Sequence, residues 1–111
     1  MIDKESSFVA ISKFKSIFNL CNGDMFLGCV DVETAGGKYV FADTCECVFS
    51  YSAAYQQSEI TILWSYSDEQ LKRNGVARNF NTNYCDFVLD ENNLVMTNEN
   101  IIITIGFIRK E

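Results

Sequence analysis

Two segments, Thr44–Tyr51 (TCECVFSY) and Glu59–Tyr66 (EITILWSY), alternate large apolar with small or polar side chains at a period of two residues. This period is typical of β-strands that bury one face, because successive side chains point to opposite faces of a sheet. We expect the two segments to form a hairpin across residues 52–57. Its paired positions are then Cys47 with Ile62, Phe49 with Ile60, and Cys45 with Trp64. A slip of one residue would scatter these apolar groups over both faces, so the pattern specifies the register.

Further segments with the same period precede and follow this hairpin. The expected strands are Met25–Glu33, Lys38–Ala42, Tyr84–Leu89, a shorter segment at Leu94–Thr97, and Ile101–Ile108. Gly36 and Gly37 indicate a turn between the first two, and polar runs of Asp, Glu and Asn separate the last three. The last strand is apolar on both faces, which is typical of a central strand or of an edge covered by a helix.

The N-terminal segment has a helical period instead. Its apolar residues recur mostly at spacings of three and four, at Phe8, Ile11, Phe14, Ile17 and Phe18. We expect a helix over about residues 7–20, with Ser6 or Ser7 as its capping residue and Asn22-Gly23 as its end. The capping-box pattern of Ser67–Gln70 indicates a second helix of at most two turns.

Together these elements predict an α+β fold, with the N-terminal helix packed on a curved, mostly antiparallel sheet of five or six strands. A helix on a sheet is the simplest arrangement that buries the apolar surface of both. The alternative is a small β-barrel, closed by the strands themselves. Residues 1–111 are expected to form a single domain, because two domains of half this length would each have a marginal core.

The composition excludes several kinds of catalytic site. The chain contains no histidine, which removes His-based acid–base catalysis, Ser–His and Cys–His pairs, and His-ligated zinc. Its five cysteines are an odd number at irregular spacing, and its N-terminus lacks the basic and apolar regions of a secretory signal. We therefore expect reduced thiols, a cytoplasmic location and no membrane association.

The cysteines match no metal site well. Cys45 and Cys47 form a C-x-C pair, whereas structural zinc sites use two pairs at C-x2–4-C spacing. Without histidine, a cysteine nucleophile lacks a base, and Asp86 would raise the pKa of the neighbouring Cys85 if it lay close. We expect buried structural cysteines, no metal, no cofactor and no catalytic residues. The chain is therefore predicted not to be an enzyme.

Charge is unevenly distributed along the chain. The net charge is −6, and residues 24–69 hold eight acids but one base, Lys38. The predicted register places Glu46 and Glu59 on the face opposite Cys47, where an acidic patch would steer basic proteins and set specificity. Solubility alone also accounts for a charge of this size. The candidate partner-binding residues are Asp31, Glu33, Asp43, Glu46, Glu59, Asp68 and Glu69, with Tyr51, Tyr55 and Tyr66 as aromatic anchors.

Three functional hypotheses remain. The first is a small binding or inhibitor protein that neutralises a basic protein partner, such as an immunity protein that blocks a toxin nuclease, because nucleases present positive surface to phosphates. The acidic balance argues against direct nucleic-acid binding. The alternative is a small β-barrel that binds an apolar or aromatic ligand among Phe49, Trp64, Tyr66 and Phe87. A carboxylate hydrolase, which needs two acids about 5–10 Å apart in a cleft, is the third.

Overall fold

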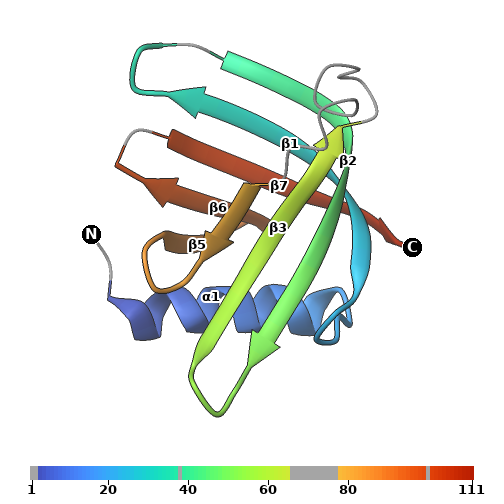
Figure 1. The fold of residues 1–111 in the computed structure, drawn as a ribbon, viewed down its shortest axis with the longest axis vertical. Helices are drawn as coiled ribbons and strands as arrows, with labels where there is room; N and C mark the ends of the chain where they lie inside the picture. The colour runs from blue at the N-terminus through green and yellow to red at the C-terminus, as the bar shows by residue number, and fades with distance from the viewer. Residues whose placement is uncertain (1–2, 38, 66–77, 100) are drawn as a thin grey trace.

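The computed structural model describes residues 3–37, 39–65, 78–99 and 101–111. Its elements are α1 (Lys4–Ile17), β1 (Met25–Thr34), β2 (Tyr39–Ser52), β3 (Gln57–Ser65), β4 (Arg78–Asn81), β5 (Asp86–Asp90), β6 (Asn93–Asn98) and β7 (Ile101–Lys110). The strands form one antiparallel sheet in the order β4-β3-β2-β1-β7-β6-β5, which curls around α1 as a half-barrel (Figure 1). Within the described ranges, no helix has the length and apolar content that crossing a bilayer requires.

The described sheet has seven strands, so the expected five or six were too few. The strand that the sequence did not indicate is β4, whose residues RNFN hold one apolar side chain and no period of two. It forms because it pairs with Glu59–Ile62 of β3. The predicted strands Lys38–Ala42 and Thr44–Tyr51 are continuous as β2. Because β4 and β5 are edges of the sheet, the described strands form an open half-barrel instead of a closed barrel.

Helix α1 begins and ends earlier than its sequence predicts. Its N-cap is Asp3, whose Oδ1 accepts a hydrogen bond from the backbone N–H of Ser6 at 2.7 Å. An ionised carboxylate accepts this bond well, and the bond lowers the pKa of Asp3. At the other end, Asn19 adopts a left-handed φ of 53°, which stops the helix before the predicted Asn-Gly pair. The helix predicted at Ser67–Gln70 lies outside the described residues.

Three β-bulges bend the sheet at neighbouring positions. Between β1 and β2, the single residue Cys29 faces both Asp43 and Thr44. The register between β1 and β7 skips Ile108, and the register between β2 and β3 skips Leu63. An extra residue bends its strand and increases the local twist, so bulges on three adjacent strand pairs curl the sheet around α1.

One predicted pairing is wrong because of the bulge in β3. The pairs Cys47 with Ile62 and Phe49 with Ile60 are confirmed. Cys45, in contrast, pairs with Ser65 and not with Trp64, because the extra residue shifts the register by one from that point.

Aromatic rings join α1 to the inner face of the sheet. The ring of Phe14 lies 4.9 Å from that of Phe18 and 6.2 Å from that of Phe26 in β1, between centroids. Phe107 of β7 stacks on Phe18 at 4.3 Å and on Phe26 at 5.6 Å. Phe14 and Phe26 are fully buried, and burying a Phe side chain stabilises a fold by about 1.5–3 kcal/mol. This cluster holds the helix inside the curve of the sheet.

The helix also covers the sheet edge at β5. Ser7 Oγ accepts a hydrogen bond from the backbone N–H of Phe87 at 3.0 Å, and both residues are buried. Because β5 is an edge strand, this N–H points away from the ladder that pairs β5 with β6 and needs another acceptor. The hydroxyl that the sequence suggested as a helix cap therefore connects the helix to the sheet.

The substitution Ser7→Ala should lower the free energy of unfolding by about 1–3 kcal/mol, because it leaves a buried N–H without its acceptor. Urea denaturation measures the loss, and hydrogen exchange at the Phe87 amide should accelerate. The matched control is Ser16→Ala on the exposed side of the same helix, which should change the free energy by less than about 0.5 kcal/mol. Equal effects of the two substitutions would contradict the role of this hydrogen bond.

Candidate protein-interaction face

The sheet face that points away from α1 is built from alternate residues of five adjacent strands, β5, β6, β7, β1 and β2. Cross-strand partners align these residues in three rows. The rows are Asp86, Thr97, Ile102 and Glu33; Val88, Val95, Thr104, Asp31 and Phe41; and Asp90, Asn93, Gly106, Cys29 and Asp43. Side chains of directly opposed residues lie about 4.5–5.5 Å apart at Cβ, so the rows form one continuous surface.

Five residues of these rows are carboxylates, and we call them the outer acidic face: Asp31, Glu33, Asp43, Asp86 and Asp90. The residues of the three rows, all within the described part of the chain, include no Lys or Arg. Glu33, Asp43 and Asp90 are exposed, while Asp31 and Asp86 are half-buried. The face therefore carries concentrated negative charge without a base of its own.

Two of these carboxylates act on one thiol: Asp31 from the same strand and Asp43 from the bulge opposite it. Cys29 is half-buried, and burial is the main cause that raises the pKa of its thiol. The charges of Asp31 and Asp43 raise this pKa further, since a nearby anion disfavours the thiolate. Asp31 and Asp43, far apart in sequence, thus act on the same point of the surface.

Exposed apolar side chains lie between the carboxylates. Phe41 is 50% exposed and is the cross-strand partner of Asp31. Ile102 is 44% exposed and is the partner of Glu33. Val88, at the β5 end of the middle row, is 48% exposed. Large apolar groups surrounded by polar ones are typical of the centre of protein–protein interfaces.

The structure separates the predicted acidic residues into two groups. Asp31, Glu33 and Asp43 belong to the outer acidic face. Glu46 lies further along β2, opposite Leu27, in a row that also contains Arg109. Glu59 of β3 pairs with Ser50 and with Asn81, whose side-chain amide donates to its carboxylate at 2.9 Å. Asp68 and Glu69 lie outside the described residues.

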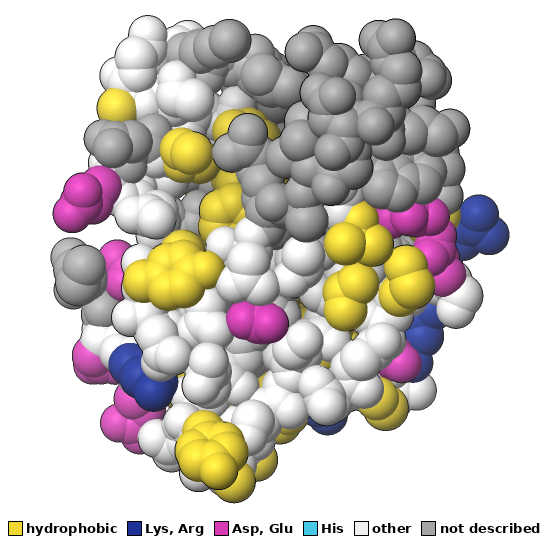
Figure 2. All heavy atoms as spheres, in the orientation of Figure 1, with side chains coloured by type: hydrophobic (Ala, Val, Ile, Leu, Met, Phe, Trp, Pro, Cys, Tyr) yellow, Lys and Arg dark blue, Asp and Glu magenta, His cyan; other side chains and the backbone are white. Residues whose placement is uncertain are grey.

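Over β3 the acidic residues are isolated. Figure 2, viewed with β3 in front, shows one acidic side chain near the centre of this face, surrounded by polar and hydrophobic groups, with other acids toward the edges. Around Glu59 the surface is an amide network, in which Asn79 donates to Thr61 at 2.8 Å and Tyr84 donates to Asn79. This part of the sheet carries little net charge.

The predicted aromatic anchors have different environments. Tyr51 is half-buried on the inner face, where its ring stacks on Phe8 at 5.2 Å and lies 5.0 Å below the Lys15 ammonium. Tyr55 is 76% exposed in the turn between β2 and β3. Tyr66 lies outside the described residues.

Sequence reasoning missed Asp86 and Asp90, and the exposed apolar residues Phe41, Val88 and Ile102. The signal was present for the first two, because Asp86, Val88 and Asp90 alternate with the buried Phe87 and half-buried Leu89. Alternation alone could not show that only β6 and β7 separate β5 from β1 in the sheet. This strand order puts the outward residues of β5 and β1 on one face.

Two described grooves lie outside the interior of the half-barrel. One, of about 550 Å³, runs along the outer side of α1, and the other, of about 290 Å³, lies at the β2–β3 hairpin beside Asn22 and Glu59. Inside, Phe49 and Phe87 are fully buried against neighbouring core residues. Neither groove is the interior cavity that the ligand-binding hypothesis requires, and nothing is described of the Trp64 side chain.

The cysteines are packed as apolar groups or partly exposed, and none of the five, all within the described ranges, forms a disulfide. Burial strongly raises the pKa of the Cys47 thiol. Burial chiefly, with a contribution from Asp86, raises the pKa of Cys85, so the expected effect of that aspartate is confirmed. Among the described residues, no three or more His, Cys, Asp or Glu side chains gather as metal ligands do.

Comparisons with known proteins identify no relative: no protein family, curated protein or solved structure matches this chain. The geometry and charge of the surface are therefore the observations that bear on function.

The substitution Asp43→Asn should lower the pKa of the Cys29 thiol, because it removes one of the two anions that oppose its ionisation. At pH 8 the alkylation of Cys29 by iodoacetamide should accelerate, since the thiolate is the reactive form. Mass spectrometry of the digested protein resolves this thiol from the other four. Glu99→Gln, in the exposed turn between β6 and β7, should leave the rate unchanged. An unchanged rate in Asp43→Asn would show that Asp43 does not act on this thiol.

Proposed function

We propose that this protein binds a basic protein partner through the outer acidic face and thereby neutralises it, in the manner of an immunity protein that blocks a nuclease. The observation that carries the proposal is the concentration of five carboxylates on one sheet face that no described element covers, together with exposed Phe41, Ile102 and Val88. The carboxylates attract the basic partner and speed its association, and the apolar side chains stabilise the complex through buried contacts.

Several of the described bases lie away from the three rows of this face, which supports a directional charge on the molecule. Lys4, Lys13 and Lys15 are on α1, and Arg109 and Lys110 are at the end of β7. Lys110 is already paired with Asp24 at 3.3 Å. Because the three lysines of α1 lie on the other side of the sheet, the protein orients an approaching basic partner toward the outer acidic face, which raises the association rate.

A nuclease suits this surface because its substrate-binding site must attract phosphates. Lys and Arg supply most of that attraction, so a protein that presents carboxylates on a rigid sheet competes for the same positive surface. The apolar anchors add the desolvated contacts that charge alone does not provide, since a few buried groups supply most of the binding energy of an interface. By comparison, no observation among the described residues favours the interior ligand site or a carboxylate hydrolase.

The test compares capture of host proteins by the wild type and by the double variant Glu33→Gln/Asp43→Asn. Captured proteins are quantified by mass spectrometry at low and physiological salt. A basic protein retained by the wild type should fall by about tenfold or more with the double variant, because two charge contacts are lost at its interface. With the purified partner, stopped-flow measurement should show that the association rate falls and depends less on salt.

The matched control is Glu59→Gln/Glu111→Gln, which removes two negative charges away from the outer acidic face and should retain the partner. Phe41→Ala should increase the dissociation rate with little effect on the association rate, because it removes a contact and no charge. Equal retention by the wild type and by Glu33→Gln/Asp43→Asn, or loss of acidic proteins only, would reject the proposal.

A further inference from the structure

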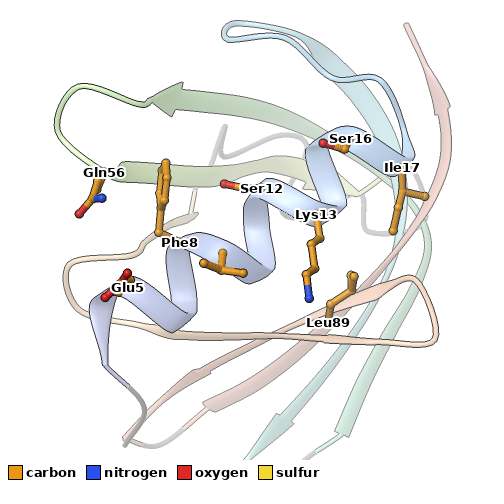
Figure 3. Close-up of a pocket in the computed structure, with 9 residues that line it drawn as sticks. Glu5, Phe8, Ser12, Lys13, Ser16, Ile17, Gln56 and Leu89 are labelled. Atoms are coloured by element: carbon orange, nitrogen blue, oxygen red, sulfur yellow. The ribbon is translucent and has the colours of Figure 1, made fainter.

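One ridge on the outer side of α1 is not used by the fold. Glu5, Val9, Lys13 and Ile17 are spaced by four residues and are all exposed, Val9 at 46% and Ile17 at 47%. They line the groove of about 550 Å³, with Phe8, Ser12, Ser16, Gln56 and Leu89 as its other walls (Figure 3). The opposite side of the helix supplies the core residues Ile11 and Phe14, so the ridge is additional apolar surface.

The charges on this ridge do not satisfy each other. Glu5 and Lys13 are eight residues apart, which separates them by about 12 Å along the helix axis and prevents a direct ion pair. Within the described part of the chain neither belongs to an ion pair. The ridge thus carries an acid, an apolar residue and a base in order, at equal steps of one helical turn.

We propose that two copies of this chain dimerise through α1, with the helices antiparallel and the two-fold axis at Val9. In this arrangement Val9 packs on the partner's Val9, and Glu5 of each copy faces Lys13 of the other. A two-fold axis produces both ion pairs at once, because a contact of one residue with another is repeated in reverse. Ser12 and Ser16 are small enough to let the two helices approach closely.

Charge selects this register among those that align the two ridges. A shift by one turn, with the axis at Lys13, would pair Val9 with the partner's Ile17 but place two Lys13 ammonium groups against each other. An axis midway between Val9 and Lys13 would bury each charge against an apolar side chain. Like charges in contact and unpaired buried charges are both costly, so the axis at Val9 is favoured.

The walls of the groove lie on both sides of the helix. In Figure 3, Gln56 stands beside the Phe8 end of the helix, and Leu89 stands beside Lys13 and Ile17 on the other side. A two-fold axis at Val9 exchanges these two diagonally opposed walls, so Gln56 of each copy faces Leu89 of the other across the interface.

The dimer is independent of the proposed function. The outer acidic face lies on the far side of the sheet from α1, so dimerisation leaves it accessible and keeps the two acidic faces apart. Repulsion between copies that each carry −6 is screened beyond about 10 Å at 0.1 M salt. One helix face of 14 residues offers a small contact, which predicts a weak dimer with a Kd on the order of 100 µM.

Sedimentation velocity of the full chain at increasing concentration, at 0.1 M salt, tests the dimer. Lys13→Glu or Glu5→Lys alone should weaken dimerisation by about tenfold or more. Each substitution replaces both symmetry-related ion pairs by contacts between side chains of the same charge. The combined variant Glu5→Lys/Lys13→Glu should restore the wild-type Kd to within about threefold, since it exchanges the two charges. This restoration also excludes unfolding as the cause, and far-UV circular dichroism checks each variant.

The controls are Arg109→Glu and Asp90→Lys, which change the net charge as much but lie off the ridge and should leave the Kd unchanged. Three results would each overturn the proposal: a wild type that stays monomeric at a concentration ten times the expected Kd, a Lys13→Glu variant that dimerises as the wild type does, or a combined variant that fails to restore dimerisation.

Discussion

The curvature of the sheet around α1 is the constraint on which the rest of the structure depends. A seven-stranded sheet that stayed flat could not enclose one helix of 14 residues, and its inner apolar face would remain exposed. Bulges at Asp43–Thr44, Leu63 and Ile108 supply the bend, and the rings of Phe14 and Phe26 fill the space it creates. Because the helix occupies the inner side, the outer side of the sheet is left for polar residues.

The same bend helps to create the surface that we assign to function. The bulge opposite Cys29 turns Asp43 outward beside Asp31, while the sheet order places β5 within three strands of β1 and adds Asp86 and Asp90. Carboxylates from distant parts of the chain thereby share one face with exposed apolar groups. The net charge of −6 is accordingly a directional property of the molecule, with acids on the outer sheet face and several of the bases on the helix.

Much of the fold could be predicted because local patterns determine it. The period of two identified β1, β3 and β7 and the pairs of Cys47 and Phe49, since burial of one face allows a single register. The helix was found for the same reason, from its period of three and four. Its boundaries were wrong, because Asp3 caps the first turn and Ser7 is occupied by the Phe87 amide, a contact between residues far apart in sequence. β4 was missed since a short polar strand has no pattern of its own and forms only by pairing with β3.

By itself, the sequence determined which residues face inward, the absence of histidine chemistry, and the excess of acids in its central part, because alternation and composition are properties of the chain alone. Only the tertiary structure decided which of those acids lie together. Glu59 is equivalent to Asp31 in sequence pattern, yet it lies in an amide network on β3, while Asp86 joins the outer acidic face. The physical reason is that strand order and bulges arise from pairing between distant segments, and these pairings set the neighbours of every surface charge.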